Sequence, residues 1–295
     1  MLPILFRVGP IGVGTHDFFS LIALAVGFAI YYWELRRRRL LEERIVLISL
    51  LALVGGVVGA RLLLAWEHLD WYGPALAQYP ISWVIENSGK SIIGAVVGAY
   101  VMVLVAKRWL GYTGSTGDCY AFALPIGVAI GRIGCFLSEL PLGKPTDLPW
   151  GMRVSPEAAA AFPYCPGCDV AMHPTMLYEI GFNLLAIGVL LAIRPKVVVQ
   201  GDLLKLYLVG AGVFRFLVEF IRTSPPQVLG LTAPQLVLIP LLGLLLVHFV
   251  RQFRRGVYRL PEPPPARGKQ PARAGTRLEP SDPVPVGAVL EVPHG

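Results

Sequence analysis

The sequence predicts an all-α polytopic membrane protein with seven transmembrane helices. Of the 295 residues, 55% are hydrophobic and only 15% are charged, whereas an ordinary soluble domain contains about 25% charged residues. The mean hydropathy of the chain is +0.61. Several apolar stretches approach the length of about 20 residues that a helix needs to cross a bilayer. This composition is incompatible with an intrinsically disordered chain and disfavours a soluble enzyme.

Seven apolar stretches are the candidate spans. The first is followed by four consecutive arginines, Arg36 to Arg39, and not by a clean cleavage site, so we expect a membrane anchor rather than a signal peptide. The other six are separated by loops that differ in their Lys and Arg content. In chain order, the expected spans cover residues 17–34, 46–66, 91–106, 119–138, 174–193, 203–222 and 231–250.

Lysine and arginine in the short loops predict the orientation of these spans. Five arginines follow the first span, Lys107 and Arg108 follow the third, and Arg194 and Lys196 follow the fifth, whereas residues 67–88 contain neither residue type. Because cytoplasmic loops are enriched in Lys and Arg, we expect the N-terminus outside and the C-terminus in the cytoplasm. The net charge of +7 is therefore assigned to cytoplasmic loops and not to a nucleic-acid surface.

Residues 1–255 are expected to form the transmembrane domain. Within it, residues 139–173 form a longer outer, periplasmic loop that is rich in Pro and Gly. Residues 256–295 are rich in Pro, Arg and Gly and lack a periodic apolar face, so we expect a disordered cytoplasmic tail. This tail is either a solvated linker or a segment that touches anionic lipid.

Ionisable residues inside the expected spans indicate a functional site, because each costs about 2.5–3.5 kcal/mol to insert. Five of them fall in the outer half of the bilayer, and His173 joins them at the mouth of the fifth span. Arginine offers a planar fork of donors that suits phosphate or carboxylate, so a polar cavity for an anionic headgroup is expected. The alternative is a structural salt-bridge network, since two of these residues have i,i+4 spacing. The five residues are Arg61, Arg132, Glu179, Arg215 and Glu219.

Glycines accompany these charges. Gly94 and Gly98 have the small-xxx-small spacing that favours close helix packing. Gly127, Gly131 and Gly134 surround Arg132, where they would allow close packing and also let a headgroup approach the backbone.

The same segments carry longer motifs. Residues 131–136 are Gly-Arg-Ile-Gly-Cys-Phe, with Gly143 following, and residues 173–179 are His-Pro-Thr-Met-Leu-Tyr-Glu. Residues 214–222 are Phe-Arg-Phe-Leu-Val-Glu-Phe-Ile-Arg, residues 59–61 are Gly-Ala-Arg, and Asp118 precedes the fourth span. In sequence and order these motifs resemble those of the prolipoprotein diacylglyceryl transferases, over residues 10–250 and with the same seven-span, N-out topology.

The resemblance implies an enzyme of the bacterial plasma (inner) membrane. Such an enzyme transfers a diacylglyceryl group from phosphatidylglycerol to the lipobox cysteine of a preprotein and releases glycerol-1-phosphate. The implied partners are phosphatidylglycerol, the lipobox-containing preprotein and membrane lipid, with no cofactor, metal or nucleic acid. The reaction needs a bound phosphate whose leaving charge is neutralised and a group that takes the proton of the thiol, because the thiolate is the nucleophile.

The resemblance also assigns roles by position. Arg132 would hold the lipid phosphate, Arg215 would stabilise the leaving phosphate, and Glu219 and Glu179 would orient both guanidinium groups. We expect Cys135, about one helical turn beyond Arg132, to be able to enter the cavity. The catalytic candidates are Arg132, Arg215 and Glu219. The substrate-binding candidates are Arg132, Arg61, His173 and Tyr178 at the outer mouth, Glu179, Cys135, and Gly143, which would allow a tight turn beside the headgroup.

The sequence departs from the family pattern at positions expected to take up the proton of the acceptor thiol. Ile93 stands where the family has a histidine, the usual candidate for the general base, and Cys135 stands where the signature has an asparagine. Another group, His16, His173 or Glu179, could act as the base, or the arginines alone could lower the pKa of the acceptor thiol. The third alternative is a diverged paralogue that transfers a lipid group to another acceptor, or a non-catalytic lipid-binding or lipid-moving protein.

The four cysteines do not form a disulfide scaffold. In the outer loop Cys165 and Cys168 are expected to form a disulfide, with free thiols as the alternative. They lack the partners that a zinc site needs. Cys119 is expected to be a small packing residue.

Overall fold

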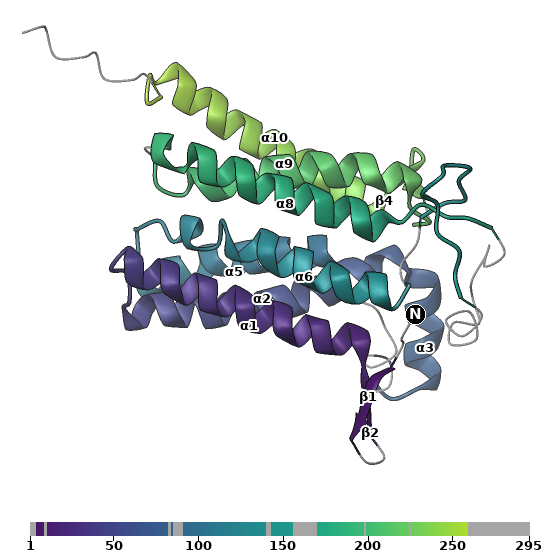
Figure 1. Cartoon of the computed structure of the whole chain (residues 1–295). Coiled ribbons are helices and arrows are strands. Elements are labelled where there is room, and N and C mark those ends of the chain that lie inside the picture. Colours follow the sequence, from purple (N-terminus) through teal and green to yellow (C-terminus); the bar gives the residue numbers. More distant parts are fainter. Residues whose placement is uncertain are drawn as a thin grey trace, which may run out of the picture. The chain divides into compact units, whose positions relative to one another are not determined.

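The computed structural model describes residues 4–8, 11–81, 84, 91–139, 143–155, 170–197, 199–224 and 226–258. The chain divides into two compact units, Met1–Val257 and Tyr258–Gly295. All helices and strands of the described residues belong to the first unit (Figure 1). The predicted tail from residue 259 onwards and the pair Cys165 and Cys168 lie outside the described residues.

Each of the seven apolar stretches predicted from the sequence is helical. They form α1 (Thr15–Arg37), α2 (Glu43–Glu67), α5 (Ile92–Leu110), α6 (Ala123–Leu137), α8 (Thr175–Ile193), α9 (Asp202–Val218) and α10 (Ala233–Arg254).

Six helical segments of the described chain are long and apolar enough to cross a membrane. The helix α9, with 17 residues, is not among them. The protein is therefore a mostly helical, polytopic membrane protein, while the seventh span and the orientation remain predictions. The six segments are Thr15–Arg37, Glu43–Glu67, Ile92–Leu110, Gly117–Leu137, Thr175–Lys196 and Ala233–Arg254.

Shorter elements that the sequence did not predict join these helices. The helix α3 (Leu69–Gln78) follows α2, and the 3-10 turns η1 (Gly117–Cys119), η2 (Arg194–Lys196) and η3 (Glu219–Ile221) lie at helix ends. Two antiparallel hairpins pair β1 (Ile4–Val8) with β2 (Ile11–Gly14) and β3 (Pro226–Val228) with β4 (Leu231–Thr232).

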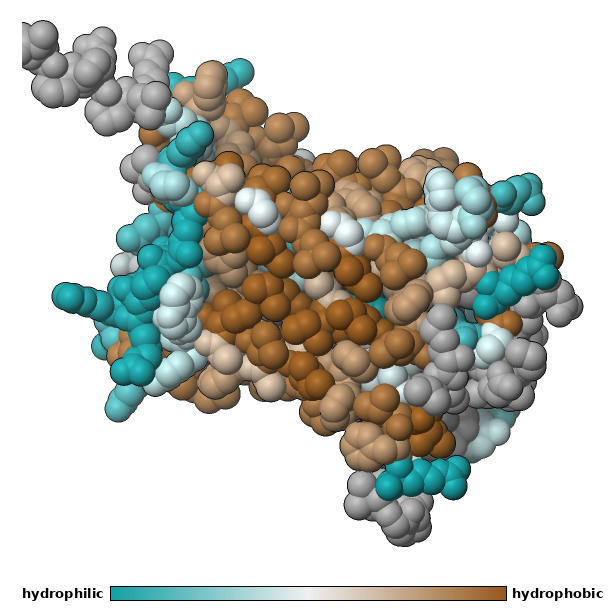
Figure 2. Space-filling model, viewed as in Figure 1, coloured by the Kyte–Doolittle hydropathy of each residue, from teal (hydrophilic) through white to brown (hydrophobic). Residues whose placement is uncertain are grey.

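The outer face of the helices is apolar. Figure 2 shows a broad hydrophobic surface over the helices, bordered by hydrophilic residues at both ends. Leu21 of α1, Leu185 of α8 and Leu244 of α10 are 67%, 68% and 70% exposed. Such exposure is unfavourable in water and favourable against lipid chains, because burying apolar area contributes about 25 cal/mol per Å². The surface is thus that of a membrane-embedded bundle.

Glycines set the closest helix contacts. Gly55 and Gly59 of α2 face Gly94 and Gly98 of α5, and a Cβ added at Gly59 would lie 2.8 Å from the Cα of Gly98. The close packing predicted from the small-xxx-small spacing is confirmed.

The glycines around Arg132 face α1. A Cβ added at Gly134 would lie 2.6 Å from the Cβ of Phe19, and Gly127 and Gly131 have Ala23 as their nearest neighbour. Close packing against α1 therefore requires glycine at Gly134, whereas a Cβ at Gly127 or Gly131 would make an ordinary contact.

Local signals in the sequence fix several helix ends. Ser91 caps α5 by accepting a hydrogen bond from the backbone of Gly94 at 3.3 Å, and Gly111 ends this helix with a left-handed φ of 62°. Thr232 and Gln235 form a reciprocal capping box at the start of α10. These caps satisfy backbone groups that have no partner in lipid.

Candidate active site

Glu179 of α8 is the centre of a buried cluster of charges. Its side chain, 7% exposed, contacts Arg132 of α6, and its Oε1 lies 3.2 Å from Nη1 of Arg215 and 3.7 Å from Nη1 of Arg222. One carboxylate thus contacts three guanidinium groups that come from two other segments of the chain. The sequence predicted a layer that includes Arg132, Arg215 and Glu179, and these three side chains are in contact.

Glu219 is the second carboxylate of the cluster. It begins η3, its side chain is fully buried, and its Oε2 lies 2.8 Å from Nη2 of Arg215 and 3.8 Å from Nε of Arg222. The i,i+4 pair predicted from the sequence is therefore formed. Because Arg215 also contacts Glu179, this pair is part of the larger cluster rather than an isolated bridge.

Arg222 is the member of the cluster that sequence reasoning missed as a site residue. In the sequence Arg222 is only the last residue of the motif 214–222. In the structure it directly follows η3. Its Nε and Nη1 atoms are buried and, among the described residues, have no hydrogen-bond partner, because contacts of 3.7 and 3.8 Å are too long for hydrogen bonds. Buried donors of this kind are costly unless a further acceptor binds.

The helix α2 adds one more carboxylate near the cluster. Glu67, the last residue of α2, is buried and interacts electrostatically with Arg215 and Arg222. The same helix carries Arg61, the remaining arginine of the predicted layer. Glu67 could not be recognised from the sequence, because it lies just beyond the predicted span 46–66 and matches no motif.

Cys135 lies beside the cluster, as predicted. Its side chain is 8% exposed, and its Sγ lies 3.7 Å from Nη1 of Arg132. His16, near the start of α1, interacts with the same thiol. Cys135 is therefore a neighbour both of Arg132 in the buried cluster and of the half-exposed imidazole of His16.

His173 and Tyr178 lie together at the mouth of α8. The Nδ1 atom of His173 is 3.2 Å from the hydroxyl of Tyr178, and Nε1 of Trp150 donates a hydrogen bond of 2.8 Å to that hydroxyl. Trp150 belongs to the segment 139–173 that the sequence predicts as a loop, and the sequence analysis assigned it no role.

Gly143 joins this mouth to the arginine cluster. Its N–H donates to the carbonyl of His173 at 2.8 Å, and it pairs with Arg222 as an isolated antiparallel bridge. A Cβ at this position would lie 2.5 Å from the carbonyl oxygen of Ile221 and 2.9 Å from the Cβ of His173. Glycine is required here by this close approach, since Gly143 does not have a positive φ.

Glu139 holds the next part of the outer loop. Its Oε2 accepts a hydrogen bond of 2.6 Å from the backbone N–H of Ser155. Burial favours the neutral carboxyl, but the hydrogen bonds to the carboxylate outweigh it and lower the pKa of Glu139. This anchor therefore stabilises the folded loop above the usual pKa of a glutamate and is lost as the pH falls through the lowered value.

Two other positions that the sequence motifs single out have packing and capping contacts. Ile93 packs in an apolar group with Leu63, Ala233 and Leu238. Asp118 accepts hydrogen bonds from the backbone N–H groups of Leu203 and Leu204 at the start of α9. Asp118 thus caps a neighbouring helix.

The fold and the cluster together define a polytopic membrane protein with a buried arginine–glutamate site where α6, α8 and α9 meet. Residues 3–251 match the family model described as prolipoprotein diacylglyceryl transferase. The chain belongs to the prolipoprotein diacylglyceryl transferase family.

Several relatives carry the name phosphatidylglycerol–prolipoprotein diacylglyceryl transferase. The protein of Bordetella parapertussis is 32% identical over 249 residues, which cover 78% of this chain and 86% of the relative. The protein of Nitrosospira multiformis is 30% identical over 291 residues, which cover 90% of both chains. The protein of Legionella pneumophila strain Lens is 29% identical over 259 residues, which cover 81% of this chain and 93% of the relative.

Proposed function

We propose that this protein transfers the diacylglyceryl group of phosphatidylglycerol to the lipobox cysteine of a prolipoprotein, with release of glycerol-1-phosphate. Family membership supports this reaction. The observation that carries it in this chain is the convergence of three guanidinium groups on Glu179 inside a membrane-embedded bundle. Fixed positive charge in a site that excludes water stabilises a leaving phosphate strongly.

Arg132 and Arg215 bind the phosphate in this proposal, and Arg61 contributes to the binding of the substrate. Glu179 and Glu219 hold the guanidinium groups in place, so that little reorganisation is needed when negative charge develops on the phosphate. The orphaned donors of Arg222 provide further hydrogen bonds to the same anion. His173, Tyr178 and Gly143 form the outer mouth through which the substrates enter.

The thiol proton needs an acceptor, and Ile93 lies in an apolar group that provides none. Glu179 does not take this role, because both of its carboxylate oxygens already contact guanidinium groups. We assign this role to His16, which interacts with Cys135, the thiol that lies 3.7 Å from Nη1 of Arg132. The imidazole takes the proton, the acceptor sulfur bonds to the glycerol carbon, and the C–O bond to phosphate breaks, with its electron pair leaving on the phosphate.

The proposed membrane topology has seven spans, with the N-terminus outside and the C-terminus in the cytoplasm of a bacterium. Together α9 and η3 run from Asp202 to Ile221, which gives 17 plus 3 residues and meets the length of about 20 residues for a span. Residues 1–255 are the transmembrane domain, 139–173 the periplasmic loop and 256–295 the cytoplasmic tail. The cluster then lies in the outer half of the plasma (inner) membrane.

The test is a turnover assay on the purified full-length protein in phosphatidylglycerol liposomes with a lipobox peptide. The expected result is release of glycerol phosphate together with a peptide mass increase of one diacylglyceryl group. Arg132→Gln should lower turnover by at least about 100-fold, the size of effect seen for the loss of one preorganised donor to a developing anion.

Arg108→Gln at the end of α5 is the matched control, because it removes the same charge outside the cluster. Its turnover should equal that of the wild type. A wild-type protein without turnover, assayed beside an active relative, would overturn the proposed reaction. Unchanged turnover in Arg132→Gln would overturn the role of this arginine.

A further inference from the structure

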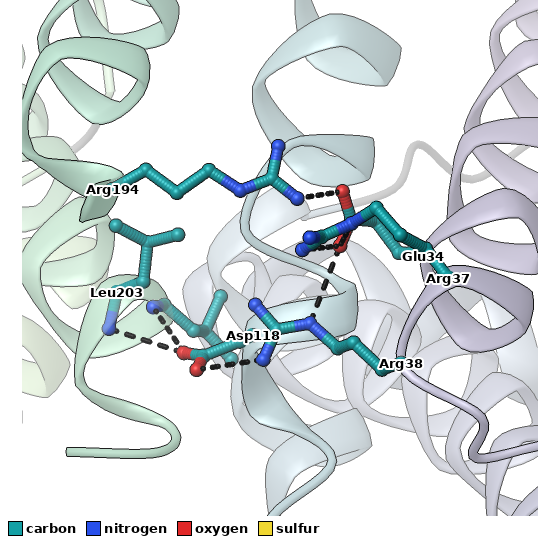
Figure 3. Close-up of polar contacts among 7 residues, drawn as sticks. Glu34, Arg37, Arg38, Asp118, Arg194 and Leu203 are labelled. Carbon is teal, nitrogen blue, oxygen red and sulfur yellow. Dashed lines mark hydrogen bonds and ion pairs between the residues drawn. The ribbon is translucent and has the colours of Figure 1, made fainter. Parts of the chain in front are cut away.

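A second charged cluster lies at the other end of α1, around Glu34. The side chain of Glu34 is fully buried, and its Oε2 accepts hydrogen bonds from Arg37 Nη2 at 2.9 Å and Arg38 Nε at 3.3 Å (Figure 3). Its Oε1 accepts a hydrogen bond of 2.5 Å from Nη2 of Arg194 in η2. Glu34 thus fixes three guanidinium groups from two distant segments.

This cluster is separate from the proposed active site. His16, beside Cys135, and Glu34 are 18 residues apart on the same helix, which corresponds to about 27 Å along its axis. The cluster has no role in the proposed reaction.

The cluster carries an excess of positive charge. Arg38 also contacts Oδ2 of Asp118 at 3.4 Å. Three guanidinium groups against the carboxylates of Glu34 and Asp118 leave a net charge of +1. The hydrogen bonds to Glu34 use Nε and Nη2 of Arg37 and Nη2 of Arg194. In the part of the chain that the structure describes, the remaining N–H groups of these two side chains are available to an anion.

A surface hollow opens beside these arginines. It has a volume of about 590 Å³ and is lined by Arg37, Arg38, Leu191, Arg194 and Pro195. Leu191, on the last turns of α8, is 54% exposed. The lining of the hollow therefore combines charged hydrogen-bond donors with exposed apolar atoms. Such a lining favours an amphiphilic ligand, with a charged and an apolar part, over a free anion.

Aromatic residues mark the depth of this hollow in the membrane. Tyr32 and Trp33 are 43% and 56% exposed on α1, and the guanidinium groups of Arg36 and Arg37 each lie 5.9 Å from one of these rings. Exposed Trp and Tyr concentrate at the headgroup level of membranes. The hydrophilic end at which α1 terminates borders the apolar surface in Figure 2. Lipid phosphates lie at the same level.

We propose that this hollow binds the phosphodiester of one anionic membrane phospholipid between Arg37, Arg38 and Arg194. One phosphodiester carries the single negative charge that balances the cluster. Glu34 holds the arginines in place before the lipid arrives, which lowers the entropic cost of binding. Leu191 and Pro195 contact the apolar part of the lipid. The bound lipid is structural, since it lies far from the cluster around Glu179.

The test counts bound lipids by native mass spectrometry on the full-length protein in detergent, with phosphatidylglycerol added. Arg132→Gln is used as the background, so that the proposed substrate site contributes little. In this background, Arg37→Gln should weaken retention of one phosphatidylglycerol by about tenfold or more, as expected for the loss of a hydrogen bond between charged groups.

Arg36→Gln is the matched control, because Arg36 is an exposed arginine on the same helix that does not line the hollow. It should leave retention unchanged. If Arg37→Gln does not fold, Arg37→Lys, which keeps the charge next to Glu34 but lacks the planar fork, should show a smaller loss.

Three results would overturn the proposal. The first is equal retention in the variants of Arg36 and Arg37. The second is equal retention of a zwitterionic phospholipid, which would remove the electrostatic basis. The third is displacement of the lipid by millimolar inorganic phosphate, which would show a site for a free anion. Loss of turnover alone bears on the proposed reaction and not on this site, so the two proposals fail separately.

Discussion

Gly143 shows how a single missing side chain joins two parts of the site. The outer loop reaches the segment that carries Arg222 only because no Cβ separates the backbone of Gly143 from Ile221. The neighbouring N–H of Lys144 then donates to the carbonyl of Ile221 at 2.7 Å. The position of Arg222, and with it the arginine cluster, therefore depends on this contact.

Gly143→Ala should lower both stability and turnover. The added methyl group would force the loop away from Ile221 and His173, at a cost of about 1–3 kcal/mol as for other overpacked sites. Thermal unfolding in detergent and the turnover assay measure the two effects. Gly188→Ala on α8 is the control, because nothing lies within 4 Å of its added Cβ. Equal behaviour of the two variants would refute the close-approach argument.

Ile93→His places the imidazole of the family pattern at its usual position. Because Ile93 lies among Leu63, Ala233 and Leu238, the new side chain would be a polar group in an apolar site, at a cost of about 1–3 kcal/mol. We expect a lower unfolding temperature and no gain in turnover, whereas His16→Asn should reduce turnover. A large gain from Ile93→His would show that the proton acceptor belongs on α5.

The contact between α2 and α5 shows that closely packed helices need small residues at their interface. Four glycines allow the two backbones to meet. The small-xxx-small spacing of Gly94 and Gly98 predicted the close packing but not that α2 is the partner. The apolar helices could likewise be predicted from the sequence, because the length and hydropathy of each helix are properties of one continuous segment. Gly127, Gly131 and Gly134 were ambiguous, since a glycine spacing does not say whether a helix or a lipid lies opposite.

Gly59→Ala should separate α2 from α5. The new methyl group would overlap the carbonyl oxygen of Gly94 and lie 2.8 Å from the Cα of Gly98. A substitution of this type costs about 1–3 kcal/mol, measured as a lower unfolding temperature in detergent. Gly56→Ala is the matched control, because its Cβ would lie at an ordinary distance of 3.4 Å from the carbonyl oxygen of Ala95, and a drop of equal size would refute the argument.

The elements missed in the sequence depend on partners or on atypical turns. The hairpin of β3 and β4 turns at Leu229 and Gly230, with φ values of 54° and 74°, a two-residue turn in which Asn or Asp usually holds the first position. Trp150 was assigned no role because its hydrogen bond joins residues 28 positions apart. Asp118 matched a motif, yet its partners lie 85 and 86 positions away.

The protein as a whole is a membrane bundle with charged clusters near both ends of its helices. Arg132, Glu179, Arg215 and Glu219, which were predicted to share a layer, are brought into contact, and Arg222 joins them. A layer of this kind is predictable because charges inside spans are rare. The individual pairs of guanidinium groups and carboxylates could not be predicted, since they depend on how α6, α8 and α9 are rotated against one another.

The proposed topology has a direct test in the position of the C-terminus. With seven spans and the N-terminus outside, a C-terminal epitope should resist protease in intact spheroplasts and be cleaved in inside-out vesicles. If α9 did not cross, six spans would place the epitope outside, and cleavage in spheroplasts would result. An epitope in the loop near Asp147 should show the opposite pattern and serves as the internal control.

The buried carboxylate of Glu34 also bears on the order of events during synthesis. Its contact with Arg194 joins residues 160 positions apart, and at about 5–20 residues per second the ribosome needs roughly 8–32 s to make the intervening chain. During this interval Arg37 in the last turn of α1 and Arg38 at its C-cap already neutralise the carboxylate. The first helix therefore enters the bilayer with its charge locally compensated, and Arg194 completes the contact once the fifth apolar segment has emerged.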